Sequence, residues 1–353
     1  MRKIIHLIPY DGIGGVEAAA RSMIDTRADD LTFTVRFLFP TVTAREQRGA
    51  TFNPLRLVTE TFAIAGAAPD LLVVSLWRSA IVGILVRLLN ARVRLVTFVH
   101  NSKDAHAADR VVTRLAIRLS EAVWTDSAAS VQRRFARPLG RPVTTISYLA
   151  QHLEPLPAPA PDAPPAPVFA FWGRLSAQKN VGRALAFFAR IHAARPDARF
   201  LVIGPDGGEE TMLRELASDL GLDQAVTFTG SRPFEAIRPL LEEAGARFCL
   251  QTSRYEGMAM SVTEAMQLGL VPVVSPVGEI AHYCREGDNA VLLPEAEDGD
   301  DGPAAAAVLS LLEDPAGYAA LRASGVARWT DQPLYRDSVL AAARGLLTTK
   351  PAN

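Results

Sequence analysis

The sequence contains only two cysteines, Cys249 and Cys284. Two thiols cannot build the disulfide framework of a small secreted domain, and their spacing is not that of metal ligands. The chain also lacks a long uncharged stretch, because its most apolar run, 80–99, contains three arginines and an asparagine. A membrane-spanning helix needs about 20 mostly uncharged residues, so the sequence predicts none. The N-terminus runs out of apolar residues before a signal peptide could form. We therefore expect a protein of the reducing cytoplasm.

The composition is that of a globular protein with more than one core. The chain has 353 residues, of which 49% are hydrophobic and 21% are charged. This apolar content excludes a disordered chain, and the length suits about two domains.

The net charge of −1 conceals an uneven distribution. Residues 1–150 contain 20 basic and 12 acidic residues, and the remaining residues contain 17 basic and 26 acidic ones. A basic half joined to an acidic half indicates different partners for the two, with an anionic partner for the first.

A proline-rich segment, 153–167, divides the chain. Proline removes backbone donors and favours extended conformations, so we expect a semi-rigid linker between a domain at 1–152 and a domain at 168–353, with the last helix able to cross back to the first. Short apolar runs alternate with helical patterns on both sides, which predicts βαβ units and two Rossmann-like domains whose parallel sheets face each other across a cleft. The predicted strands are 4–8, 32–39, 71–75, 93–99, 122–124, 143–146, 168–172, 199–203, 225–228, 247–251 and 271–274. The predicted helices are 16–25, 80–89, 109–119, 128–135, 181–193, 209–220, 234–243 and 261–268.

Two loops at strand ends have the composition of anion sites. In 11–17, glycines that include Gly14 and Gly15 precede a helix, although Glu17 stands where the dinucleotide fingerprint requires glycine. In 173–180, one loop contains Arg174 and Lys179. The Arg174 guanidinium can bind two oxygens at once and the Lys179 ammonium adds a second positive charge, a combination that suits a diphosphate. Alone, the first loop is as consistent with an ordinary turn as with a ligand loop. For the second loop, two solvated charges are the alternative to a diphosphate site.

The most informative segment is 253–266. Glu256 lies on a loop and Glu264 near the start of an apolar helix, and small residues separate them. The helix-start N–H groups can bind phosphate, and the two carboxylates can accept hydrogen bonds from sugar hydroxyls. A carboxylate in the first turn of a helix also stabilises that helix, so helix capping is the alternative for Glu264.

These segments together resemble family-four retaining glycosyltransferases, which have the GT-B fold. The resemblance rests on G-R-L-S-A-Q-K-N at 173–180 and on E-G-M-A-M-S-V-T-E-A-M-Q-L-G-L-V-P-V-V at 256–274, where the two glutamates have the spacing that defines the family. It extends to Gly14-Gly15-Val16-Glu17, to His100-Asn101 and to Gly278-Glu279, and thus covers most of the chain.

The resemblance implies roles for particular residues. Glu256 holds the donor sugar, Glu264 the nucleotide ribose, Arg174 and Lys179 the diphosphate, and His100 the transferred sugar or its phosphate. We therefore group Glu256, Arg174, Lys179 and His100 as catalytic. The predicted substrate-binding residues are Gly14, Gly15, Glu264, Gly257, Met258, Ala259, Met260, Ser261, Gly204, Ser231 and Arg232. Without the family, His100 could equally be a structural histidine at a strand end.

The chain departs from the family pattern in two loops. Residues 147–151 lack the Asn-Gly turn common before the interdomain crossing, and the loop 275–279 is shorter than usual. No Asp-x-Asp triplet follows a strand, because 298–301 lies in a late acidic run. We therefore expect no metal and no cofactor, with a nucleotide-diphosphate sugar, UDP in preference to GDP, as co-substrate.

The acceptor is expected on the basic first domain. Arg110, Arg114 and Arg118 recur every four residues beside an apolar stripe, and four more arginines follow at 133, 134, 137 and 141. This pattern fits either a solvated helix face or docking to an anionic membrane or a lipid-diphosphate acceptor. Nucleic acid is not an expected partner, since the patch lacks interleaved aromatic residues.

The resemblance implies hexosyl transfer to a saccharide or lipid-linked acceptor, in bacterial cell-surface polysaccharide or glycolipid assembly. Two alternatives remain: an inactive subunit that binds a nucleotide sugar, and a nucleotide-sugar epimerase of the same fold.

Overall fold

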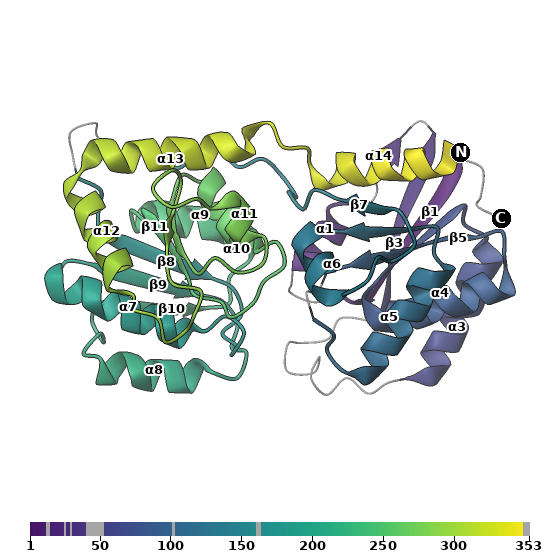
Figure 1. Cartoon of the computed structure of the whole chain (residues 1–353), viewed down its shortest axis with the longest axis horizontal. Helices are drawn as coiled ribbons and strands as arrows, with labels where there is room; N and C mark the ends of the chain where they lie inside the picture. Colours follow the sequence, from purple (N-terminus) through teal and green to yellow (C-terminus); the bar gives the residue numbers. More distant parts are fainter. Residues whose placement is uncertain are drawn as a thin grey trace. The chain divides into compact units, whose positions relative to one another are not determined.

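The computed structural model describes residues 1–11, 15–24, 26–28, 30–39, 53–100, 103–159 and 164–348. The chain forms two compact units, of which unit 1 comprises Met1–Gln151 and Pro333–Asn353 and unit 2 comprises His152–Gln332. Each unit is an α/β structure built around its own sheet (Figure 1). The expectation of two Rossmann-like domains with parallel sheets is confirmed.

The sheet of unit 1 has the strand order β2-β3-β1-β4-β5-β6-β7. All its neighbouring strands are parallel except β2 and β3. The strands are β1 Arg2–Tyr10, β2 Arg27–Ala28, β3 Leu31–Phe39, β4 Leu71–Ser75, β5 Arg94–Val99, β6 Ala122–Thr125 and β7 Val143–Thr145. The central strand β4 is buried at every residue, as expected for a sheet covered on both faces.

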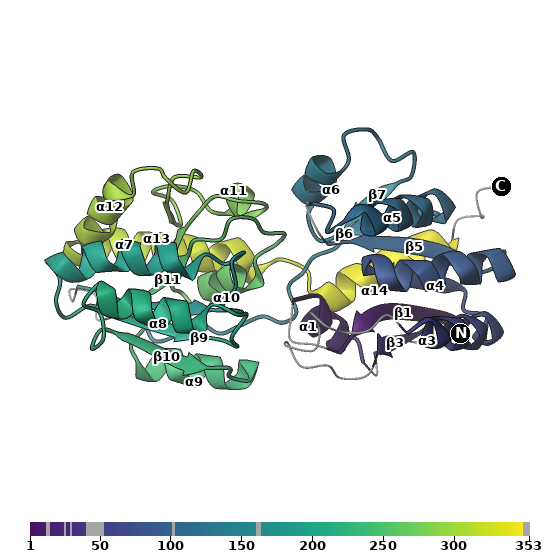
Figure 2. The same cartoon turned by 90° about the horizontal axis from the view of Figure 1, so that it is seen from below.

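Helices cover both faces of this sheet. The helices are α1 Gly15–Arg21, α3 Pro54–Ala67, α4 Leu76–Leu89, α5 Ala107–Leu119, α6 Ala128–Arg134 and α14 Tyr335–Thr348. Figures 1 and 2 show α3, α4 and α5 side by side on one face and α14 on the other. The C-terminal helix thus belongs to unit 1, although unit 2 separates it in sequence from the rest of that unit.

Helix α3 has no counterpart among the predicted elements. The Asn53 side chain caps it by accepting a hydrogen bond from the Arg56 N–H, and Pro54 occupies the first turn. Leu57, Thr61 and Ile64 form its buried stripe. The cap, the proline and the spacing of the stripe are readable in the sequence, so this helix could have been predicted.

Helix α4 begins four residues before the predicted start at Ala80. It follows β4 directly, because Leu76 turns the chain with a φ of 65°. A non-glycine residue rarely adopts this left-handed conformation, so the turn leaves no sequence signal.

The sheet of unit 2 has the order β10-β9-β8-β11-β12-β13, and all its pairs are parallel. The strands are β8 Val168–Trp172, β9 Arg199–Ile203, β10 Val226–Gly230, β11 Phe248–Gln251, β12 Val271–Val274 and β13 Val291–Leu292. The helices are α7 Val181–Ala194, α8 Glu210–Asp219, α9 Phe234–Glu243, α10 Met260–Gln267, α11 Ile280–Tyr283, α12 Gly302–Glu313 and α13 Pro315–Thr330. Figure 2 shows α7 and α8 together on one face of this sheet. The core that includes buried residues of these helices is rich in phenylalanine.

The described part of the proline-rich segment packs on unit 2. Leu156 is buried there, and its N–H donates to the Leu268 carbonyl over 2.9 Å. The Arg322 guanidinium donates to the Leu156 carbonyl, and the Leu153 N–H donates to Gln267. These contacts give a segment without regular structure a fixed path along this unit.

Candidate functional site

The predicted residues of unit 2 lie at the carboxyl ends of neighbouring parallel strands, where α/β sheets bind ligands. Gly173, Arg174 and Lys179 follow β8, Gly204 follows β9, Ser231 and Arg232 follow β10, and Glu256 follows β11. The structure therefore brings residues separated by more than 80 positions to one edge of a sheet. Arg174, Ser231 and Arg232 are exposed there.

Glu256 and Lys179 form an ion pair. The Lys179 Nζ lies 2.6 Å from the Glu256 Oε1. The same oxygen accepts hydrogen bonds from the Ser253 hydroxyl over 2.7 Å and from the Gln251 amide over 3.1 Å. Glu256 is only 6% exposed, so these donors replace the water that a buried carboxylate loses. The sequence pointed to both charged residues but not to their pairing.

Glu264 has a different environment. Its Oε2 accepts a hydrogen bond from the indole N–H of Trp172 over 2.7 Å. Burial raises the pKa of the Glu264 carboxyl to about 7, although Trp172 and the nearby Lys179 oppose the shift. The two glutamates therefore differ in kind, since one pairs with a cation and the other titrates near neutral pH.

The loop Gly257–Ala259 connects Glu256 to helix α10. Ala259 has a φ of 53° and caps α10 without a side-chain hydrogen bond, so the first N–H groups of the helix, at Met260 and Ser261, keep donor capacity for an anion. Tyr283 donates its hydroxyl to the Met258 carbonyl over 2.8 Å, and the Glu279 N–H donates to the Gly257 carbonyl. These contacts hold the loop in place.

Two glycines allow backbones to meet at this edge. A Cβ atom on Gly204, whose φ is 150°, would lie 1.8 Å from the Gly173 carbonyl oxygen. A Cβ atom on Gly278, whose φ is 61°, would lie 2.2 Å from the Glu256 carbonyl oxygen. Only glycine fits either position, and the second directly supports the backbone of Glu256.

In unit 1, His100 lies at the end of β5 within a buried hydrogen-bonded chain. Its Nε2 is 2.9 Å from the Ser75 Oγ, and its Nδ1 is 3.2 Å from the Asp126 Oδ2. The Ser75 Oγ is also 2.8 Å from the His6 Nε2. The Tyr148 hydroxyl lies 3.5 Å from the His100 Nδ1, and burial raises the pKa of this phenol well above its usual range.

The donor and acceptor roles in this series of hydrogen bonds follow from the groups at its two ends. The Asp126 carboxylate accepts, so His100 carries a proton on Nδ1, and in the neutral form of the ring Nε2 accepts from the Ser75 hydroxyl. The Ser75 oxygen then accepts from the Nε2–H of His6. Burial lowers the pKa of His6 to about 3, with a smaller contribution from His100, so the His6 ring is neutral. Both nitrogens of His100 therefore have partners within unit 1.

Sequence reasoning missed four members of this hydrogen-bonded group, namely His6, Ser75, Asp126 and Tyr148. Ser75 ends β4 and Asp126 follows β6, so both lie at the sheet edge where His100 was expected. Polar residues at the ends of adjacent parallel strands were the available signal. Of the predicted glycine pair, Gly15 is the first residue of α1, and Gly14 lies outside the described residues.

The described residues contain no group of three or more His, Cys, Asp or Glu side chains that could hold a metal ion. They also form no helix long and apolar enough to cross a membrane.

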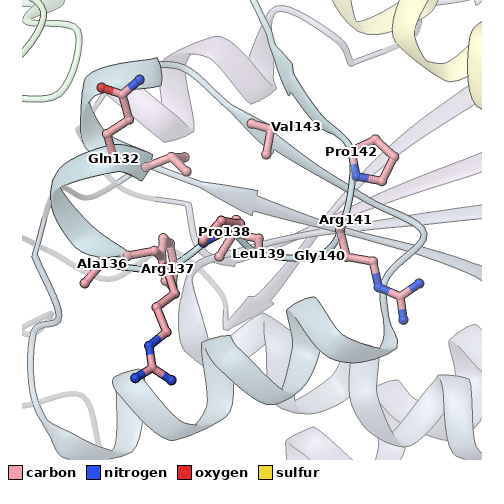
Figure 3. Close-up of a pocket in the computed structure, with 11 residues that line it drawn as sticks. Gln132, Ala136, Arg137, Pro138, Leu139, Gly140, Arg141, Pro142 and Val143 are labelled. Atoms are coloured by element: carbon pink, nitrogen blue, oxygen red, sulfur yellow. The ribbon is translucent and has the colours of Figure 1, made fainter.

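Unit 1 also has an open pocket of about 740 Å³, which lies between α6 and β7 (Figure 3). Its walls combine apolar residues such as Val131 and Leu139 with the arginines Arg137 and Arg141. None of the predicted site residues lines it.

Comparisons with known proteins find similar sequences and similar structures. Residues 158–327, which lie in unit 2, match the family model described as "Glycosyl transferases group 1". The chain is 28% identical over 124 residues to a GDP-mannose:cellobiosyl-diphosphopolyprenol alpha-mannosyltransferase of Xanthomonas oryzae, a match that spans 35% of this chain and 32% of the relative. It is 30% identical over 168 residues to a D-inositol 3-phosphate glycosyltransferase of Acidothermus cellulolyticus, which spans 45% and 36% of the two chains. The matches thus cover about a third of each relative.

Solved structures resemble the whole chain. The Anabaena protein Alr3699/HepE, solved in complex with UDP and glucose, has a TM-score of 0.78 at 18% identity, with 99% of this chain and 100% of that chain covered. A sucrose-phosphate synthase from Thermosynechococcus elongatus has a TM-score of 0.75 at 19% identity, with 98% of each chain covered. The fold is therefore GT-B. Together with the family model and the relatives, it supports a GT-B glycosyltransferase.

Proposed function

We propose that this protein is a retaining, family-four hexosyltransferase that moves a sugar from a nucleotide-diphosphate sugar to a saccharide or lipid-linked acceptor. The observation that carries the proposal is the cluster at the edge of unit 2. There the Lys179–Glu256 ion pair, the partly buried Glu264 and the open start of α10 lie together. The cluster combines donors for a diphosphate with carboxylates for sugar and ribose hydroxyls. We infer UDP as the nucleotide in preference to GDP, in line with the UDP bound to HepE.

The reaction breaks the bond between the sugar C1 and the diphosphate oxygen and forms a bond from C1 to an acceptor hydroxyl oxygen. In our proposal the acceptor attacks from the face that the diphosphate leaves, and the acceptor proton passes to the departing phosphate oxygen. Arg174, Lys179 and the first N–H groups of α10 stabilise the negative charge that develops on the leaving group. These groups stabilise the leaving group without a metal ion or another cofactor, and the reaction needs no enzyme nucleophile.

Nucleotide binding is the first test. We expect one of UDP, GDP, ADP, CMP and dTDP, supplied without metal, to raise the melting temperature of the wild type. A ligand at 100 times its Kd adds about 2.7 kcal/mol of stability, which corresponds to several degrees. Glu264→Ala removes the predicted ribose partner, so this variant should lose most of the shift. A folded wild type that none of the five nucleotides stabilises would refute the proposal.

Turnover is the second test. Glu256→Ala should reduce transfer by about 10²- to 10³-fold, comparable to the loss of one electrostatic contact to the transition state. Unchanged turnover in this variant would contradict the site assignment. Product analysis distinguishes transfer to an acceptor from epimerised donor and from binding without turnover. Activity lost in chelator and restored by Mg²⁺ or Mn²⁺ would contradict the metal-independent mechanism.

We also propose that the protein is cytoplasmic and that unit 1 contacts the anionic inner face of the membrane. This contact would serve bacterial polysaccharide or glycolipid assembly. Helices α3, α4 and α5 lie side by side (Figure 2). They expose large apolar side chains, among them Phe62 at 64% and Leu88 at 69%. Arg56 and Arg118 are exposed on the same helices. Arg110 and Arg114, which the sequence placed in the same stripe, form ion pairs with Asp104 and contribute less charge. Apolar and basic groups on one surface are typical of interfacial binding.

Sedimentation with vesicles tests this contact. The wild type should sediment with phosphatidylglycerol vesicles at low salt and less at high salt, since each basic group contributes only about 1 kcal/mol. Phe62→Asp with Leu88→Asp should weaken binding. Met212→Asp, at an exposed apolar residue of α8 in unit 2, is the matched control. A wild type that stays in solution at low salt would refute the contact.

A further inference from the structure

Arg78 has an unusual environment in the first turn of α4. Its guanidinium carbon lies 4.5 Å from the centroid of the Trp77 ring and 5.5 Å from that of the Tyr10 ring. Tyr10 ends β1 and α4 follows β4 directly, so two adjacent strand ends supply the three residues. Contact with aromatic faces holds a guanidinium in a fixed orientation and leaves its in-plane N–H groups to bind a partner.

That partner is not a side chain of the described residues. Arg134 in unit 1 pairs with Asp104 and Asp109, whereas Arg78 forms no ion pair among the described residues. Its Nε is buried and has no hydrogen-bond partner. A buried donor without a partner costs about 1–3 kcal/mol, and more when the group is charged. The rest of the guanidinium, which the two rings hold in orientation, is suited to an anion that the described residues do not supply.

The position of Arg78 links it to the predicted reaction centre. A small cavity of about 30 Å³ is lined by Leu76, Trp77 and His100, so the Arg78 turn adjoins the histidine. The Ser75 hydroxyl is engaged with His6 and His100 and does not cap α4. The N–H groups of this helix start therefore add positive potential beside the guanidinium.

We propose that Arg78 binds an anionic group of the acceptor, a phosphate or a carboxylate, by a two-pronged hydrogen bond, with Trp77 and Tyr10 fixing the guanidinium. The acceptor would then be an acidic saccharide or a sugar phosphate and not a neutral sugar. This inference rests on the proposed function, because it assigns the acceptor side of the same reaction. It adds a binding group outside the residues that sequence analysis selected.

The test measures binding to the full-length protein saturated with the nucleotide that stabilises it. Calorimetry measures the binding of three probes, which are α-D-glucose 1-phosphate, D-glucuronate and D-glucose. The wild type should bind at least one anionic probe and prefer it to glucose. Arg78→Ala should weaken that binding by about 10- to 100-fold, the range for a hydrogen bond to a charged group. Arg78→Lys keeps the charge but loses the planar guanidinium that donates two parallel hydrogen bonds, so it should recover only part of the affinity.

Arg87→Ala is the matched control, since Arg87 lies in the last turn of the same helix and donates to the Ala91 carbonyl. It should bind the probes as the wild type does. Preference for glucose 1-phosphate identifies a phosphate acceptor, and preference for glucuronate identifies a uronic acid. Equal affinity of the wild type and Arg78→Ala, or no binding of either anionic probe to the wild type, would overturn the proposal. The nucleotide-induced shift in melting temperature should persist in Arg78→Ala, so a failure here is distinguishable from a failure of the proposed function.

Discussion

Glu264 shows how burial changes the chemistry of a side chain. In the unfolded chain its pKa is near 4.5, and in the folded protein it is about 7. The folded state thus holds the proton more tightly. The stability that the neutral carboxyl contributes is complete below pH 4.5, falls as the pH rises and is lost above pH 7.

Glu264→Gln should therefore change the pH dependence of stability. The amide oxygen can still accept from Trp172, but it does not ionise. At pH 8 the variant should be more stable than the wild type by up to about 3 kcal/mol, and at pH 4.5 the two should be equal. Urea unfolding at both pH values measures this. A wild-type advantage at pH 8 would contradict the burial argument.

Ser75 and Ser79 are both fully buried, yet their hydroxyls differ. Ser75 bridges His6 and His100, whereas the Ser79 hydroxyl is buried without a hydrogen-bond partner. Ser75→Ala leaves two imidazole nitrogens without partners and should destabilise unit 1 by about 1–3 kcal/mol. Ser79→Ala removes an unsatisfied hydroxyl and should be neutral or stabilising. A comparison of the two urea midpoints tests the buried chain, and equal effects would contradict it.

At the scale of elements, the site depends on short turns that bring strand ends together. Gly278 and Gly287 have similar φ values, 61° and 70°, but only Gly278 lies against backbone. Substitution of a left-handed glycine costs roughly 1 kcal/mol in conformational strain alone.

Gly278→Ala adds a collision with the Glu256 carbonyl to that strain, so it should cost clearly more than Gly287→Ala, whose Cβ would meet nothing within 4 Å. It should also displace Glu256 and reduce transfer. Thermal unfolding and activity assays of the two variants provide the measurement. Similar stability and full activity in both would show that the loop after β12 does not position the site.

At the scale of the whole molecule, unit 1 depends on a helix from the far end of the chain. In α14, Tyr335 is 1% exposed, its N–H donates to the Leu149 carbonyl, and its ring lies 5.4 Å from that of Tyr148. Arg344, on the exposed side of the helix, pairs with Asp30.

Tyr335→Ala should destabilise unit 1 by about 3–5 kcal/mol, the usual cost of removing a large buried aromatic ring. Arg344→Ala removes only a surface ion pair and should cost less than about 1 kcal/mol. Limited proteolysis would show this as earlier cleavage within 1–151 in the first variant. Cleavage at the same rate in both variants would mean that α14 contributes little.

The sequence alone determined the alternation of strands and helices, because apolar periodicity and strand-end loops depend on neighbouring residues. It also predicted Arg174, Lys179, Glu256 and Glu264 as site residues, from their places after strands or near a helix start and from the family resemblance. The capped helix α3 could also have been predicted from the sequence.

Only the tertiary structure decided which of these groups touch. The Lys179–Glu256 pair, the Trp172 hydrogen bond to Glu264 and the chain from His6 to Asp126 each join residues that are distant in sequence. The same holds for the turn at Leu76, whose left-handed backbone has no local signal, and for the contact of the Arg78 guanidinium with the Trp77 and Tyr10 rings. Contacts of this kind depend on how separate strands align at one sheet edge. The burial that raises the pKa of Glu264 also exists only after the strands have aligned.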